Sequence, residues 1–175
     1  MSAGATRPIE ILVVEDNERH SDLIKDELEI EVPTSSVTVA ASVSAAFEAL
    51  QARSYDLVLL DFRLPDGDGL EILTQMKADG RREPVVFVTT SSSTTTAVAA
   101  MKIGAEDYIV KEEGYLEVLP FVVNEVLERA RLRAERADMA KKASQADRLS
   151  SLNTLMASIL LTRRESVHGS IDSGR

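Results

Sequence analysis

Cysteine and tryptophan are absent from this chain of 175 residues, and histidine occurs only twice, at His20 and His168. Without cysteine there is no disulfide, no thiolate metal site and no thiol catalysis. The two histidines do not form a cluster with metal-ligand spacing, and we expect both on the surface. The chain also lacks an apolar run long enough to span a bilayer, which argues against a membrane partner. Its N-terminal residues lack the apolar core of a signal peptide, which predicts a cytoplasmic location.

An excess of positive charge is missing as well. The net charge is -9; residues 1–110 carry 9 basic and 19 acidic side chains, whereas residues 111–175 carry 11 basic and 10 acidic ones. Because an acidic surface repels nucleic-acid phosphates, we expect no direct nucleic-acid binding. The sequence contains neither a P-loop nor a kinase-type glycine loop, so nothing indicates that the chain uses ATP itself.

From residue 9 to about residue 130, aliphatic segments alternate with amphipathic ones. The predicted strands are 9–14, 36–41, 56–60, 84–89 and 106–110, and the predicted helices are 17–30, 43–53, 67–79, 94–103 and one from about 116. Five β–α units in this order predict an α/β fold with a doubly wound, five-stranded parallel sheet.

Four of the five predicted strands end in side chains that carry chemistry. Glu15 and Asp16 follow the first strand, Asp61 follows the third, Thr89 closes the fourth and Lys111 follows the fifth. The carboxyl ends of strands in open α/β sheets are where ligands bind. Each of these residues alone could be an ordinary polar loop residue, but the combination indicates a functional site.

The motifs around these residues are specific in combination. They are Val13-Val14-Glu15-Asp16-Asn17, Leu60-Asp61-Phe62-Arg63-Leu64-Pro65 with Gly69 eight residues beyond Asp61, Val88-Thr89-Thr90, and Gly104-Ala105-Glu106-Asp107-Tyr108-Ile109-Val110-Lys111. Together they resemble the receiver (CheY-like) domain of two-component response regulators over about residues 8–130. The resemblance implies a flavodoxin-like strand order, 2-1-3-4-5, which brings the four strand ends to one edge of the sheet.

The resemblance also implies roles for these residues. Asp61 would be the phosphoacceptor, with a sensor histidine kinase or a phosphotransfer protein as partner. A carboxylate that meets a phosphoryl group needs a neutralising cation, and Mg²⁺ suits hard oxygen ligands. By the family's pattern the metal site would comprise Asp16, Asp61, the backbone carbonyl of Arg63 and, through a water molecule, Glu15.

Lys111, Thr89 and Tyr108 complete the predicted pocket. Lys111 would pair with Asp61 at rest and with a phosphoryl oxygen afterwards, although a solvent-facing lysine is the alternative. Thr89 would hydrogen-bond another phosphoryl oxygen, and Tyr108 could rotate inward as Thr89 moves. For Tyr108, an ordinary core aromatic is the alternative. Glu112 follows Lys111 where the family usually has proline, so the chain departs from the family's pattern at this bend.

The chain beyond the receiver contains no glycine between Leu116 and about Arg164, which predicts a long C-terminal helix. We therefore expect a disordered N-terminus over residues 1–7, a receiver domain over 8–130, a helical or coiled-coil extension over 131–164 and a disordered tail over 165–175. Three-four spacing places Leu149, Leu152, Met156 and Ile159 on one apolar stripe.

This part of the extension resembles the first helix of a histidine-kinase dimerisation domain, but Leu161 stands where that family has its phosphorylated histidine. We expect a homodimer through the C-terminal helix; a helix that packs within its own chain is the alternative.

The combined interpretation is a response regulator that signals through protein contacts of the receiver and the C-terminal helix. The alternatives are a phosphate sink or relay, or a pseudo-receiver that acts as a constitutive interaction scaffold. A hydrolase that turns over phosphate on Asp61 is disfavoured, because such enzymes usually carry a second aspartate two residues on, where this chain has Arg63. We therefore expect a phosphoacceptor signalling protein and not an enzyme.

Overall fold

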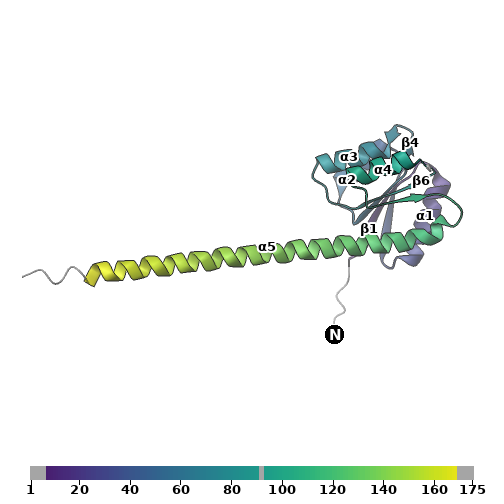
Figure 1. Cartoon of the computed structure of the whole chain (residues 1–175). Helices are drawn as coiled ribbons and strands as arrows, with labels where there is room; N and C mark the ends of the chain where they lie inside the picture. The colour runs from purple at the N-terminus through teal and green to yellow at the C-terminus, as the bar shows by residue number, and fades with distance from the viewer. Residues whose placement is uncertain (1–6, 91–92, 169–175) are drawn as a thin grey trace, which may run out of the picture. The chain divides into compact units, whose positions relative to one another are not determined.

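The computed structural model describes residues 7–90 and 93–168 of the chain. Strands and helices alternate as predicted (Figure 1), with bounds that differ from the predicted ones by no more than two residues through the start of the last helix. The strands of the main sheet are β1 (Ile9–Val14), β2 (Ser35–Ala40), β3 (Leu57–Leu60), β6 (Val85–Thr89) and β7 (Asp107–Val110); the helices are α1 (Glu18–Glu31), α2 (Val43–Ala52), α3 (Gly69–Ala78), α4 (Thr94–Ile103) and α5 (Tyr115–His168).

Within the described residues, the main sheet has five parallel strands in the order β2-β1-β3-β6-β7. Counted along the chain this is the order 2-1-3-4-5, so the predicted fold class is confirmed. The register pairs Val14 with Leu60 and Thr89 with Val110. The carboxyl ends of β1, β3, β6 and β7 therefore lie along one edge of the sheet.

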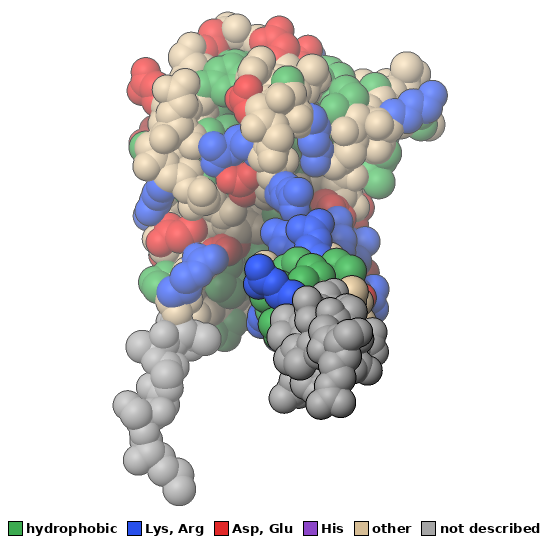
Figure 2. All heavy atoms as spheres, turned by 90° about the vertical axis from the view of Figure 1, so that its left-hand side faces the viewer, with side chains coloured by type: hydrophobic (Ala, Val, Ile, Leu, Met, Phe, Trp, Pro, Cys, Tyr) green, Lys and Arg blue, Asp and Glu red, His purple; other side chains and the backbone are tan. Residues whose placement is uncertain are grey.

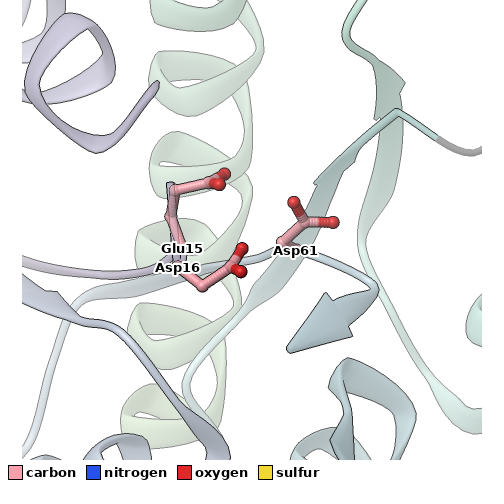
Figure 3. A group of neighbouring side chains, drawn as sticks. All are labelled: Glu15, Asp16 and Asp61. Carbon is pink, nitrogen blue, oxygen red and sulfur yellow. The ribbon is translucent and has the colours of Figure 1, made fainter. Parts of the chain in front are cut away.

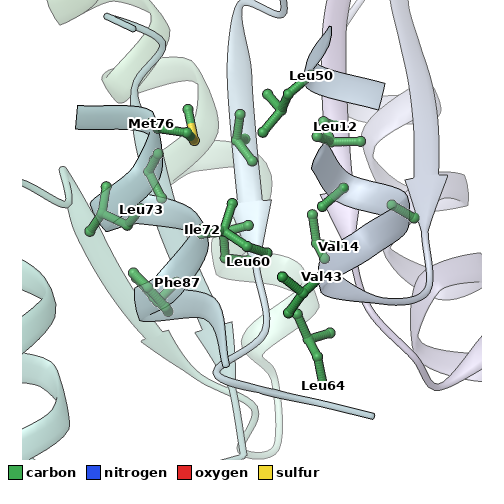
Figure 4. Close-up of a cluster of buried hydrophobic side chains, with 14 of the residues drawn as sticks. Leu12, Val14, Val43, Leu50, Leu60, Leu64, Ile72, Leu73, Met76 and Phe87 are labelled. Atoms are coloured by element: carbon green, nitrogen blue, oxygen red, sulfur yellow. The ribbon is translucent and has the colours of Figure 1, made fainter. Parts of the chain in front are cut away.

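The central strands are buried on both faces, as their nearly continuous aliphatic sequences require. Val58 and Leu60 of β3 belong to a buried cluster with α2 and α3, part of which Figure 4 shows. Leu57 and Leu59 face a second cluster, built with α1 and the first turns of α5. Full burial of one such side chain stabilises the fold by about 1.5–3 kcal/mol. The strand that leads into Asp61 is thus held from both sides.

A short antiparallel hairpin follows Asp61 and was not predicted. It consists of β4 (Arg63–Leu64) and β5 (Gly67–Asp68), which pair Arg63 with Asp68 and Leu64 with Gly67. Strands of two residues are too short to show a hydrophobic period, so no sequence pattern predicted them. Asp68 then begins α3, because its carboxylate accepts a hydrogen bond from the Glu71 amide at 3.0 Å.

The chain divides into two compact units, Met1–Ala130 and Arg131–Arg175. The described part of the second unit is helical and ends at His168, beyond the predicted end at Arg164. Ion pairs of i,i+4 spacing lie along it, among them Arg131 with Glu135 and Lys142 with Asp138, both at 2.8 Å. Residues 1–6 and 169–175, on which most of the predicted disorder falls, lie outside the described residues. No helix in the described part of the chain is long and apolar enough to cross a membrane.

Candidate functional site

Three carboxylates meet at the carboxyl ends of β1 and β3. Glu15 and Asp16 follow β1 and Asp61 follows β3, and one carboxylate oxygen from each lies within 4.8 Å of the others. Figure 3 shows the three side chains turned toward a common space. Backbone hydrogen bonds fix the strand ends: the Asp61 amide donates to the Val14 carbonyl at 2.8 Å, and the Glu15 amide donates to the Ala40 carbonyl at 2.9 Å. Glu15 and Asp61 are buried, whereas Asp16 is exposed.

Lys111 brings the opposite charge to this cluster. Its ammonium donates a hydrogen bond to Asp61 Oδ2 at 2.6 Å and a second one to Glu15 Oε2. Only 2% of the Lys111 side chain is exposed, so the solvent-facing alternative is wrong. Burial lowers the pKa of Lys111, but the hydrogen bonds and negative charges of Asp61 and Glu15 outweigh burial and raise it above its ordinary value. Lys111 is therefore protonated and paired with both carboxylates.

Thr89 lies next to Lys111 across two neighbouring strands. It is fully buried, and its carbonyl accepts a hydrogen bond from the Lys111 amide at 2.8 Å. Tyr108, in contrast, packs against the cluster of α2 and α3, where its ring stacks on Phe87 with centroids 6.2 Å apart. The sheet thus holds the backbones of Thr89 and Lys111 side by side at its carboxyl edge, whereas the Tyr108 ring is partly buried and packs against Phe87.

Close packing fixes the backbone after Asp61. The Arg63 amide donates to Asp61 Oδ1 at 3.3 Å, and the Gly69 amide donates to the Phe62 carbonyl at 2.9 Å. A Cβ atom on Gly69 would lie 2.4 Å from the Asp61 carbonyl oxygen and 2.8 Å from Phe87 Cε1, closer than a real Cβ contact. Glycine is needed here for space, which explains its place in the motif.

The sequence analysis missed two residues near the cluster. His20 of α1, expected only as a surface residue, lies with Nδ1 at 3.8 Å from Glu15 Oε1. Burial raises the pKa of the Tyr115 phenol at the start of α5, and the charges of Lys111, Glu15 and Asp61 also act on it. For His20 the sequence held no local signal, because its approach to Glu15 depends on how α1 meets the end of β1. For Tyr115 no signal was available, because its place depends on the turn after Lys111.

The donor set fits Mg²⁺. All three side chains offer hard carboxylate oxygens, no cysteine competes, and the exposed Asp16 leaves a side open to water molecules, which Mg²⁺ retains when it binds to proteins.

The comparisons with known proteins agree with this geometry. The family model of the response regulator receiver domain matches residues 11–120. The transcriptional regulatory protein YkoG of Bacillus subtilis is 35% identical over 121 residues, which cover 69% of this chain and 49% of YkoG. The response regulator ArlR of Staphylococcus saprophyticus is likewise 35% identical over 121 residues, 69% of this chain and 50% of ArlR.

Solved structures are similar over the same part of the chain. NtrX from Brucella abortus superposes with a TM-score of 0.69 at 31% identity, covering 75% of this chain and 29% of NtrX. A CheY-like receiver domain protein from Methanospirillum hungatei superposes with a TM-score of 0.65 at 27% identity, covering 73% of this chain and 99% of that protein.

The chain belongs to the response regulator receiver domain family of two-component systems. The match places its first unit among signalling phosphoacceptor domains and not among conventional enzymes. The chain spans about half the length of the curated relatives described above. The family match ends at residue 120, so the second unit receives no assignment from it.

Proposed function

We propose that this protein is a response regulator whose Asp61 accepts a phosphoryl group from the phosphohistidine of a sensor histidine kinase or a phosphotransfer protein. The observation that carries the proposal is the pairing of the buried Asp61 carboxylate with the Lys111 ammonium at 2.6 Å, beside the carboxylates of Glu15 and Asp16. A carboxylate that only stabilised the fold would not need two further acids beside it, because like charges at this separation repel.

In the proposed transfer, an Asp61 carboxylate oxygen forms a bond to phosphorus while the phosphorus–nitrogen bond of the donor histidine breaks. The electron pair of that bond stays on the imidazole of the partner. No general base is needed, since the attacking carboxylate is already ionised. The protein contributes position and compensation of charge, which suits the loose transition state of phosphoryl transfer.

Lys111 and Thr89 would then hold the transferred group. Lys111 moves its ammonium from Asp61 to a phosphoryl oxygen, and Thr89 donates its hydroxyl to another. Asp16, Asp61 and the Arg63 carbonyl would hold Mg²⁺ directly, and Glu15 would hold it through a water molecule. When bound, the cation neutralises negative charge on the carboxylates and on the incoming phosphoryl oxygens.

Thr89 and Tyr108 would form the switch. A shift of the Thr89 hydroxyl toward the phosphoryl group opens space at the end of β6, into which Tyr108 of the adjacent β7 could turn. Tyr108 is only partly buried, so a turn of its ring away from the buried Phe87 would change the exposed surface of the receiver. Partner proteins would read this change through contacts with the receiver.

We propose that the second unit provides a homodimer contact. Leu149, Leu152, Met156 and Ile159 are between 57% and 62% exposed on the helix. Figure 2 shows hydrophobic side chains at the surface of the part of α5 that faces the viewer. No charged residue occurs between Leu149 and Thr162. An apolar stripe with three-four spacing and no charge is the pattern by which helices pair, and a second copy of the same helix would cover it.

The predicted cytoplasmic location and the predicted lack of nucleic-acid binding stay predictions.

The test is intact-mass analysis after incubation with acetyl phosphate, in Mg²⁺ or in chelator, of the wild type and of Asp61→Asn. We expect one phosphoryl adduct on the wild type in Mg²⁺, and none in chelator or on Asp61→Asn. Absence of an adduct on the wild type would contradict the proposal and favour a pseudo-receiver. Repeated turnover of a small phosphoester would favour an enzyme instead.

A further inference from the structure

Helix α2 is capped by a residue from a distant part of the chain. The carboxylate of Asp66 accepts hydrogen bonds from the Val43 amide at 2.7 Å, the Ser44 amide at 2.9 Å and the Ser44 hydroxyl at 2.7 Å. The hydroxyl of the local N-cap, Ser42, accepts a hydrogen bond from the Ala45 amide at 3.1 Å and none that is described from the Val43 or Ser44 amide. The first amides of a helix have no acceptor within the helix. Asp66 therefore supplies the acceptors for the Val43 and Ser44 amides that Ser42 does not provide. Its negative charge also suits the positive end of the helix dipole.

Asp66 lies in the turn of the hairpin that follows the candidate phosphoacceptor. Its neighbours Arg63 and Leu64 form β4, and Leu64 is buried in the same cluster as Val43 of α2 (Figure 4). At its other end the hairpin is tied to Asp61, through the Arg63 amide at 3.3 Å and the close approach of Gly69 to the Asp61 carbonyl oxygen. One short hairpin thus contacts both Asp61 and the first turn of α2.

We propose that Asp66 is a positioning residue that couples the first turn of α2 to the Asp61 site. Mg²⁺ binding at the site and the hydrogen bonds from the Val43 and Ser44 amides to Asp66 would then strengthen each other. The inference rests on the proposed function, in which the Arg63 carbonyl binds the metal. Placement of that carbonyl depends on the hairpin, and the hairpin is held against α2 by Asp66. Coupling free energies are reciprocal: if an ordered first turn of α2 raises the affinity of the site for Mg²⁺, bound Mg²⁺ must stabilise that turn by the same free energy.

The Val43 and Ser44 amides allow a direct test, since their protection from hydrogen exchange comes from Asp66 and not from the helix itself. Residues that orient metal ligands typically change metal affinity by about 10-fold or more when they are removed. Reciprocity then predicts that saturating Mg²⁺ slows exchange of these two amides in the wild type by about 10-fold as well.

The experiment is hydrogen exchange followed by NMR, without and with Mg²⁺, together with a calorimetric Mg²⁺ titration. In Asp66→Asn we expect Mg²⁺ to bind about 10-fold more weakly and to leave the exchange of the Val43 and Ser44 amides unchanged. The matched control is Asp68→Asn, which changes the same residue type in the same hairpin. Asp68 caps α3 through one oxygen, Oδ1, which asparagine keeps, whereas Asp66 accepts through both of its oxygens and asparagine would keep only one acceptor. Both readouts should therefore stay as in the wild type in Asp68→Asn.

If Asp66→Asn does not fold, Ser44→Ala is the milder variant, because it removes only one of the three hydrogen bonds to Asp66. It should show a smaller loss of Mg²⁺ affinity and a smaller loss of the Mg²⁺ effect on amide exchange. Wild-type exchange at Val43 and Ser44 that does not respond to Mg²⁺ would overturn the coupling, as would unchanged Mg²⁺ affinity in Asp66→Asn or in Ser44→Ala. The acetyl phosphate adduct on Asp61 is measured on the same samples. An adduct without coupling refutes only this inference, whereas a missing wild-type adduct refutes the proposed function.

Discussion

At the scale of single residues, the Lys111 ammonium is the one lysine or arginine charge that the described contacts place against the buried acids Glu15 and Asp61. Their side chains are 2% and 9% exposed. Loss of one partner from a buried ionic cluster leaves uncompensated charge, which typically costs about 3–5 kcal/mol. We predict that Lys111→Met lowers the free energy of unfolding by about 3 kcal/mol at neutral pH, measured by urea unfolding followed by circular dichroism.

The pH dependence of the stabilisation by Lys111 follows from its raised pKa. A raised folded-state pKa means that the stabilisation is complete below the unfolded value of 10.5 and is lost as the pH rises through the folded value. Neutral pH is therefore the correct condition. The control is Lys142→Met, which breaks an exposed pair with Asp138 and should change stability by about 0.5 kcal/mol or less. Equal losses in the two variants would contradict the prediction.

Asp66 allows a prediction of the opposite pH sign. Hydrogen bonds from the Ser44 hydroxyl, the Ser44 amide and the Val43 amide lower the pKa of Asp66 from 3.8 to about 2. Its contribution to stability is therefore present above pH 3.8 and is lost as the pH falls toward 2. We predict that the wild type loses stability more steeply than Asp66→Asn across this window, measured by urea unfolding at about pH 5, 3 and 2. Parallel pH profiles would show that the Asp66 carboxylate does not hold α2.

At the scale of elements, the second unit lacks a buried core of its own, since every side chain described in residues 131–163 is exposed. Its i,i+4 ion pairs contribute only about 0.3–0.5 kcal/mol each, and its apolar stripe is exposed. We predict that changing Leu152, Met156 and Ile159 together to polar residues converts a dimer into a monomer in sedimentation velocity. The control is Leu161→Ser, which is 65% exposed but lies off the stripe and should leave the dimer intact. An unchanged sedimentation profile after the triple change would exclude this contact.

The elements also show how far sequence reasoning reaches. The alternation of aliphatic and amphipathic segments predicted the main strands and helices, and the strand ends located Asp61 and Lys111, because these signals are local and periodic. Asp66 and Asp68 both stand just before α3 and both are residue types that cap helices, so the sequence alone does not say which of them begins α3. Asp68 does so, whereas Asp66 binds α2. That contact joins residues 23 positions apart, and no local period encodes such a distance. The same limit applies to His20 beside Glu15, a contact that depends on how α1 meets the end of β1.

At the scale of the whole molecule, the charge is unevenly distributed. Of the net charge of -9, the first 110 residues carry the excess, with 19 acidic against 9 basic side chains. Inside this negative field, three acids converge at one edge of the sheet, and the described contacts pair the Lys111 ammonium with two of them, Glu15 and Asp61. Such an arrangement carries repulsion that a bound cation would relieve. The stability of the folded molecule should therefore depend on Mg²⁺ beyond what general screening by salt provides.

This reasoning predicts opposite effects of Asp16→Asn in the two metal conditions. In chelator, loss of one exposed acid relieves repulsion and leaves stability unchanged or raised by about 0.5 kcal/mol. In Mg²⁺ at about 100 times the dissociation constant, the wild type should gain about 2.7 kcal/mol, whereas Asp16→Asn should gain far less because a direct ligand is missing. Thermal unfolding in chelator and in Mg²⁺ at constant ionic strength measures both. Asp26→Asn, an exposed acid of α1 with the same change in charge, is the matched control and should keep the full response. If Asp26→Asn lost the response as well, Mg²⁺ would be acting on the field of the whole domain and not at the site that Asp16 shares with Asp61.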